Sequence, residues 1–158
     1  MHFSFMKDLF SDFDIDIRIE DNIETIYIRN RQFDDPIVIH YFPEDYYSYL
    51  LRFATQHRDT SSKEDLIQCA LSFANAEKAS IEFFENGSSR FGGEIEVSLL
   101  DSITYDNLRN YFGYTHLDLT NFTFRVRAWD TRYCFNGCFK KNDFGAVEIV
   151  KMYIWYSL

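Results

Sequence analysis

Two cysteines, Cys134 and Cys138, come closest in this chain to the spacing of a metal or redox site. A structural zinc site needs four Cys or His ligands, usually supplied as two close pairs. The four histidines are scattered along the chain and none of them forms a second close pair. The Asn136-Gly137 between the cysteines is typical of a two-residue hairpin turn. We therefore expect ordinary turn residues with no metal and no cofactor, and keep a zinc site and a redox pair as alternatives.

Other catalytic patterns are missing from the sequence. No serine lies in a Gly-x-Ser-x-Gly elbow, and the glycine-rich residues 87–93 lack the Lys-Ser/Thr pair of a phosphate-binding loop. The carboxylate pairs Asp14/Asp16 and Glu94/Glu96 stand two residues apart, so each pair points to one face of a strand. A glycosidase needs its two carboxylates across a cleft, in different environments. We expect solvated strand faces here, and we predict that the protein is not an enzyme.

Basic residues near an aromatic ring occur once. Arg125, Arg127 and Trp129 are spaced to share one strand face, and Lys140 and Lys141 follow. Positive charge beside a stacking ring is typical of sites that bind single-stranded nucleic acid. The chain has a net charge of -9, however, and phosphate contacts dominate such affinity. We expect these arginines to pair with carboxylates on neighbouring strands, and we predict no nucleic-acid partner.

Negative charge is concentrated in the first third of the chain. Residues 1–50 hold 11 Asp/Glu against 4 Lys/Arg, whereas residues 119–158 hold 3 against 6. Tyrosines lie among these acids, and tyrosine offers large contact area with little loss of rotamer freedom. Carboxylates around such rings would favour Lys and Arg on a partner, unless the rings belong to the core and the acids are merely solvated. The candidate partner-binding residues are Asp14, Asp16, Glu20, Asp21, Glu24, Asp34, Asp35, Glu44, Asp45, Tyr46 and Tyr47.

The elements that must position these residues are predicted from apolar periodicity. Alternation at period two predicts strands, and apolar residues three or four apart predict helices. Asp21-Asn22 supplies a turn, and Ser61 with Glu64 forms a capping box at a helix start. Helices are expected at residues 2–12, 43–53, 61–79 and 104–112. Strands are expected at residues 13–20, 23–30, 37–42, 80–85, 94–100, 122–129, 132–140 and 146–156.

This order of elements indicates an α+β fold: an antiparallel sheet of about six to eight strands with two to four helices packed on one face. The last strand is apolar on both faces, so we expect it to be central, covered by a helix, or part of an interface. The length of 158 residues fits a single globular domain, 1–158. No apolar run reaches the roughly 18–20 residues of a membrane span, and the amino terminus is unlike a signal peptide. With only three cysteines, we expect a cytoplasmic protein without a membrane partner.

In its size, acidity, lack of motifs and content of 17 Phe and 11 Tyr, the whole chain resembles immunity proteins of bacterial polymorphic and contact-dependent growth inhibition toxin systems. The resemblance implies a small cytoplasmic protein that binds one cognate toxin domain, often a basic nuclease, and blocks its active site. It implies a cationic protein partner, and we expect the chain alone to be a monomer or a weak homodimer. The alternatives are a small α+β enzyme or ligand-binding protein with an aromatic-lined pocket between sheet and helices, and a subunit of a homo-oligomer built on the last strand.

Overall fold

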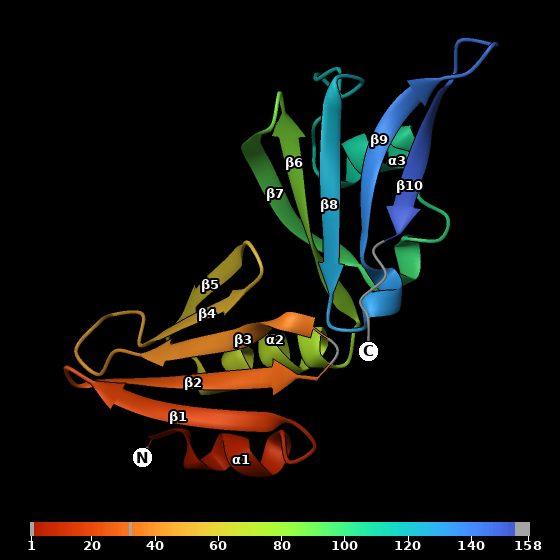
Figure 1. The fold of residues 1–158 in the computed structure, drawn as a ribbon. Helices are drawn as coiled ribbons and strands as arrows, with labels where there is room; N and C mark the ends of the chain where they lie inside the picture. The colour runs from red at the N-terminus through yellow and green to blue at the C-terminus, as the bar shows by residue number, and fades with distance from the viewer. Residues whose placement is uncertain (1, 32, 154–158) are drawn as a thin grey trace.

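The computed structural model describes residues 2–31 and 33–153, without the side chains of Phe33 and Asp34. In that part of the chain, ten strands form two antiparallel sheets of five, accompanied by three α-helices and three short 3-10 helices. Figure 1 shows the two sheets meeting at a steep angle, with the first half of the chain in one and the second half in the other.

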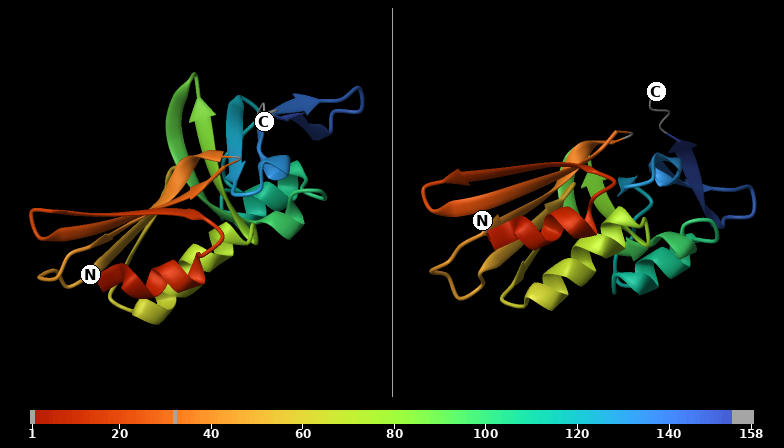
Figure 2. Two further views of the ribbon diagram at one scale, coloured as in Figure 1. Left: turned by 60° about the horizontal axis from the view of Figure 1, so that its bottom comes forward. Right: turned by 90° about the horizontal axis from the view of Figure 1, so that it is seen from below.

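Sheet A is a meander in which each strand pairs with the next along the chain. Two-residue turns at residues 21–22 and 54–55 and a longer loop at residues 42–48 keep consecutive strands antiparallel and adjacent, as in a chain of hairpins. One face of the sheet is covered by the N-terminal helices and by α2 (Figure 2). Its strands are β1 (Asp14–Glu20), β2 (Ile23–Asn30), β3 (Phe33–Tyr41), β4 (Tyr49–Phe53) and β5 (Gln56–Thr60), and its helices are η1 (His2–Phe5), α1 (Met6–Leu9) and α2 (Lys63–Ala74).

Sheet B has the strand order β10-β9-β8-β6-β7, so a crossover lies between β7 and β8. That crossover carries α3, which packs against the sheet through buried Leu108 and the edge-to-face contact of Tyr105 with Phe139. The elements of this half are β6 (Lys78–Glu85), β7 (Ser88–Glu96), η2 (Val97–Leu99), α3 (Tyr105–Tyr111), β8 (Phe122–Ala128), η3 (Thr131–Tyr133), β9 (Phe135–Lys141) and β10 (Val147–Tyr153).

Each sheet buries its own apolar core against its helices. Alternate residues of β2, Ile26 and Ile28, face the helices and are fully buried, as the alternation in the sequence predicts. The two halves are joined where Trp129, just after β8, enters the core of sheet A and packs on Phe13 and Phe53. The backbone oxygen of Trp129 also accepts a hydrogen bond from the Asn30 side chain at 2.8 Å. The second half of the chain therefore completes the core of the first.

The α+β class and the antiparallel pairing are confirmed, but a single sheet of about six to eight strands is wrong, because ten strands of the described residues divide into two sheets of five. Alternation reveals which side of a strand is buried and carries no information on which strands share a sheet. The helix expected at 43–53 is also wrong: residues 49–53 form β4, and the polar residues 56–60 form β5. Similarly, the expected loop at 86–93 is a two-residue turn followed directly by β7.

The last strand, β10, lies at the edge of sheet B among the described strands, so a central position is wrong. Residues 154–156 of the expected strand lie outside the described residues. On the face of β10 turned away from α3, Val150 and Met152 are 38% and 54% exposed. Across the part of the chain that the structure describes, no helix has the length and apolar character needed to cross a membrane.

Candidate functional site

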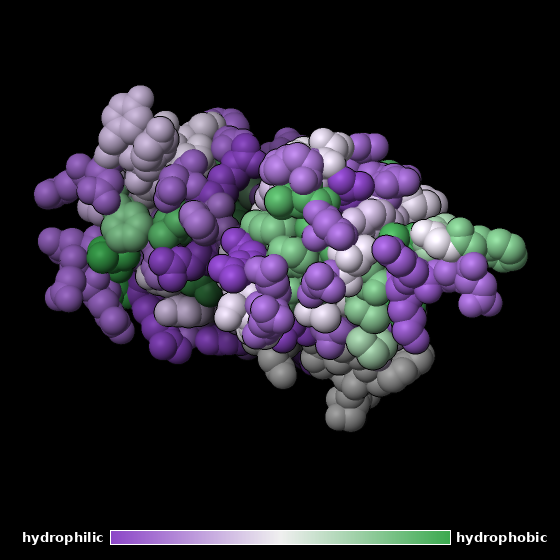
Figure 3. Space-filling view, turned by 90° about the horizontal axis from the view of Figure 1, so that it is seen from above, coloured by the Kyte–Doolittle hydropathy of each residue, from purple (hydrophilic) through white to green (hydrophobic). Residues whose placement is uncertain are grey.

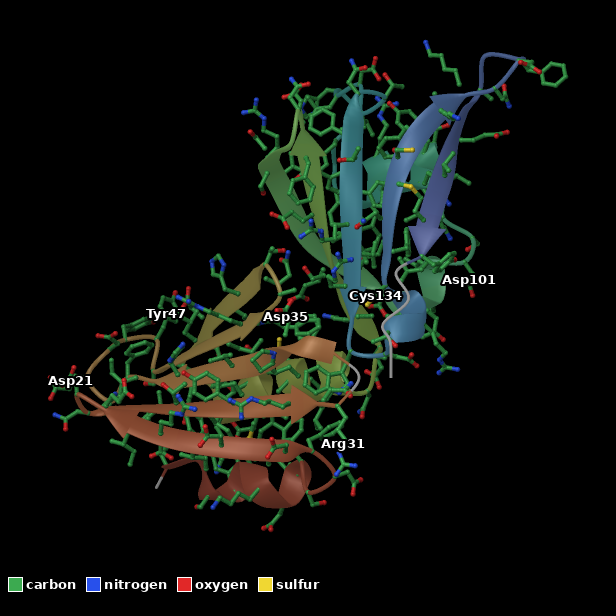
Figure 4. All side chains as sticks on the ribbon, in the orientation of Figure 1. Asp21, Arg31, Asp35, Tyr47, Asp101 and Cys134 are labelled. Atoms are coloured by element: carbon green, nitrogen blue, oxygen red, sulfur yellow. The ribbon has the colours of Figure 1, made fainter. Side chains whose placement is uncertain are left out.

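The turn between β1 and β2 forms one side of the candidate site. Asp21 and Asn22 both have positive φ, 50° and 66°, and Glu20 pairs directly with Ile23. Two central residues with positive φ define the turn type whose twist matches a hairpin, and Asp and Asn tolerate that conformation better than most residues. The turn therefore presents the Asp21 carboxylate to solvent at one end of sheet A, as Figure 4 shows.

The loop between β3 and β4 forms the other side. It is closed by a hydrogen bond from the Phe42 N–H to the Ser48 carbonyl oxygen at 2.8 Å. Glu44 and Asp45 are exposed, and after them Tyr46 and Tyr47 are 85% and 54% exposed. The two tyrosine rings meet edge to face with centroids 4.9 Å apart. These two rings therefore belong to the surface, as the binding hypothesis requires, and not to the core.

A groove of about 490 Å³ lies between the turn and the loop. We call it the acidic groove, since four carboxylates of the predicted set line it. In Figure 3 hydrophilic residues crowd this end of the molecule, on the left, around a few hydrophobic ones. The groove is lined by Ile19, Asp21, Asn22, Ile23, Glu24, Tyr41, Phe42, Pro43, Glu44 and Asp45.

The charge of the groove is not neutralised within the described residues. No ion pair of residues 2–31 and 33–153 includes Asp21, Glu44 or Asp45. Ile19, expected to be buried from the alternation of β1, is 61% exposed here and adds apolar surface beside the carboxylates. Such a combination suits the charged head and the aliphatic stem of a lysine or arginine side chain.

Glu24 lies at the back of the groove and is 6% exposed. Its two oxygens accept hydrogen bonds from the backbone N–H groups of His2 at 2.7 Å and Phe3 at 2.8 Å. The His2 ring stacks on Tyr41 with centroids 3.8 Å apart, and its Nε2 lies 2.6 Å from the Tyr49 hydroxyl. Burial lowers the pKa of His2 and raises the pKa of Tyr49. Glu24 therefore holds the N-terminal segment in place. The Glu24 carboxylate already accepts two hydrogen bonds from the backbone of that segment.

The remaining predicted acids do not join this groove. Asp14 and Asp16 lie toward the opposite end of β1, where Asp16 pairs with Arg18 at 2.7 Å and with Arg29 at 3.9 Å. Asp35 lies toward the sheet junction, far from Asp21 in Figure 4, and the Asp34 side chain lies outside the described residues. Glu20 directly precedes Asp21 and lines a smaller neighbouring hollow. The predicted surface is thus divided between two ends of sheet A.

The cysteine pair does not flank a turn, so the expected hairpin at Asn136-Gly137 is wrong. Both residues lie inside β9, and Gly137 is the one residue of that strand that fits beneath the Phe124 ring. Cys134 is buried, its thiol contacts the backbone of Ala128 at 3.3 Å, and burial raises its pKa. Among the described residues, no group of three or more His, Cys, Asp or Glu is placed to hold a metal.

The basic face expected at residues 125–129 is also different from the prediction. Arg125 lies on the face of β8 turned away from α3, but Trp129 is 3% exposed and belongs to the core of sheet A. The strand ends at Ala128, so the alternation that placed all three residues on one face stops before Trp129.

No protein-family model, no curated protein and no solved structure matches this chain.

Proposed function

We propose that this chain is a binding protein that recognises a cationic partner through the acidic groove and the adjoining Tyr46 and Tyr47. The observation that carries the proposal is the placement of Asp21, Glu44 and Asp45 around one hollow, without a cation of the described residues paired to them. Tyr46 and Tyr47, which are exposed and directly follow Asp45 in the chain, supply the contact area that binding hot spots use. Aromatic anchors beside unpaired charge favour recognition over catalysis.

Within that class, we propose an immunity protein that neutralises a cognate toxin domain, most simply a basic nuclease. The net charge of -9 supports this partner, because opposite charges speed the encounter of two proteins. Occupation of the groove by a lysine or arginine of the toxin would place this chain over a surface that otherwise binds phosphate. Inhibition then follows from steric and electrostatic exclusion of nucleic acid.

The test is an association measurement with the cognate toxin domain that this proposal requires. We expect the association rate to fall steeply as salt rises from about 50 to 500 mM, since screening shortens the range of charge attraction. Toxin activity should disappear at equimolar ratio. An affinity and an association rate that are both insensitive to salt would contradict the proposal, as would tight binding that leaves the toxin active.

A further inference from the structure

Strand β10 has an open edge. It lies at one end of sheet B in Figure 1, and among the described residues its backbone pairs with β9 alone. The outer N–H and C=O groups of such a strand can accept a further strand. Natural edge strands are usually protected against this by a bulge, a proline or a charged side chain. β10 contains no proline, and its register with β9 has no shift, so its edge is regular.

The two charged side chains of β10 are engaged within the chain. The Lys151 ammonium donates a hydrogen bond to the Leu100 carbonyl oxygen and lies 5.2 Å from the centroid of the Phe135 ring. Phe135 belongs to the core on the α3 side of sheet B, so the lysine is turned inward. The Glu148 carboxylate accepts a hydrogen bond from the Asn142 side chain at 2.9 Å. The charges that would repel an added strand are therefore held by neighbouring residues.

Exposed apolar side chains distinguish β10 from the other edge strands of the described residues. Val150, Met152 and Tyr153 are 38%, 54% and 48% exposed. By contrast, β5 has no apolar residue, β1 carries a charge at every second position, and the pairing of β7 with β6 is interrupted by a register shift. An added strand would therefore bury the most apolar surface at β10.

A second copy of β10 fits this edge. Two identical antiparallel strands around a two-fold axis form a self-complementary contact, in which residues equally far from the axis stand opposite each other on one face. An axis at any residue other than Val150 pairs at most five of the seven residues, and an axis at Glu148 or Lys151 also sets two like charges face to face. An axis at Val150 pairs all seven without a like-charged pair: Val150 with Val150, Ile149 with Lys151, Glu148 with Met152, and Val147 with Tyr153.

We propose that this chain forms a two-fold homodimer in which the β10 strands of two copies pair antiparallel, so that two five-stranded sheets join into one sheet of ten. Contact through one short strand is a small interface, so the dimer is weak. The inference goes beyond the proposed function and does not depend on the acidic groove, because β10 lies in the other sheet. Each copy has a net charge of -9, so added salt should strengthen the dimer, the reverse of its effect on a cationic partner.

Sedimentation velocity of the full chain from about 5 to 500 µM tests the dimer, since its population depends on concentration. We expect the mean mass to rise toward that of a dimer, and to rise further at about 500 mM than at about 50 mM salt. Amide hydrogen exchange within β10 should slow over the same range, while exchange within β1 stays unchanged. A monomer at every concentration would overturn the proposal and leave the edge to a strand of another protein. Protection confined to residues outside β10 would also overturn it.

Four variants test the register. Val150→Lys sets two lysines face to face at the axis and should weaken the dimer more than about tenfold, whereas Leu9→Lys adds the same charge at an exposed residue of α1 and should leave it unchanged. Met152→Glu and Met152→Lys remove the same apolar side chain but set opposite charges against Glu148 of the second copy. Met152→Lys should therefore dimerise about tenfold more tightly than Met152→Glu.

The amide spectrum reports the folding of each variant, and all four substitutions fall at exposed positions. Equal dissociation constants for the two Met152 variants would overturn the register. A Val150→Lys variant that dimerises as well as Leu9→Lys would overturn the pairing of β10 itself.

Discussion

Replacement of Glu24 by Gln tests how the acidic groove is joined to the N-terminal segment. Glu24 is 6% exposed, and its oxygens accept the N–H groups of His2 and Phe3 at 2.7 and 2.8 Å. Glutamine keeps the shape of the side chain but presents an NH₂ group in place of one oxygen. One buried backbone N–H therefore loses its acceptor, and the other loses the negative charge of its partner.

The expected magnitude follows from these contacts. An unsatisfied buried donor costs about 1–3 kcal/mol, and hydrogen bonds to charged groups are stronger than neutral ones. We expect Glu24→Gln to lower the free energy of unfolding by about 2 kcal/mol. For a chain of this size each kcal/mol corresponds to roughly 2–4 °C in Tm, so Tm should fall by roughly 4–8 °C.

The assay is equilibrium unfolding in urea, with Glu44→Gln as the matched control. Glu44 lines the same groove but is exposed, and its substitution should change stability by less than about 0.5 kcal/mol. Amide hydrogen exchange at Phe3 should accelerate in Glu24→Gln alone. If the two variants unfold at the same urea concentration, Glu24 does not hold the N-terminal segment in the way described.

Three further predictions concern the fold. Gly137→Ala should destabilise by about 1–3 kcal/mol in thermal or urea unfolding, because its Cβ would lie 2.1 Å from the Phe124 ring; a neutral effect would refute the close approach. Ser62→Ala should lose about 1 kcal/mol, because its hydroxyl caps α2, whereas Ser61→Ala should be nearly neutral; the reverse order of stabilities would place the cap at Ser61. Burial lowers the pKa of His2 below 6.5, so the unfolded chain binds more protons and stability falls as pH drops through that value. Unfolding at about pH 7.5 and 5.5 should reveal a smaller loss in His2→Gln than in the wild type, and an equal loss in both would contradict this account.

The hairpin of β1 and β2 could be predicted from the sequence because its signals are local. Alternation identified the buried Ile26 and Ile28 of β2, although it failed at Ile19 of β1, which is exposed, and Asp21-Asn22 supplied a turn of the required conformation. The start of α2 was displaced by one residue, since Ser61 and Ser62 both precede acidic residues at suitable spacing. Local patterns of this kind identify an element more reliably than they fix its boundary.

A helix was predicted in place of β4 because the apolar residues there fit both the two-residue period of a strand and the period of three to four residues of a helix. Tyr49, Leu51 and Phe53 alternate toward the core, while the preceding Pro43 and its acidic neighbours imitate a helix start. Pairing with β3 and β5 decided the outcome, and such pairing depends on distant residues. β-structure generally depends more on its tertiary context than helical structure does.

The candidate site was predicted in part for the same reason. Composition placed acids and tyrosines in one stretch of sequence, and the sheet brought Asp21 close to Glu44 and Asp45. The same sheet places Asp14 at the other end of β1, a strand of seven residues, and so away from the groove. The burial of Glu24 depends on where the N-terminal segment packs, which no local pattern specifies.

The most direct test of the acidic groove compares two triple charge reversals in binding to the toxin domain proposed above as the partner. One variant carries Asp21→Lys, Glu44→Lys and Asp45→Lys, and its control carries Asp14→Lys, Asp35→Lys and Asp101→Lys at exposed sites outside the groove. Both have the same net charge, so only the position of the charge differs. We predict that the groove variant binds roughly 100-fold more weakly, with the control within about tenfold of the wild type. Equal losses in the two variants would mean that total charge governs binding, and that the groove does not.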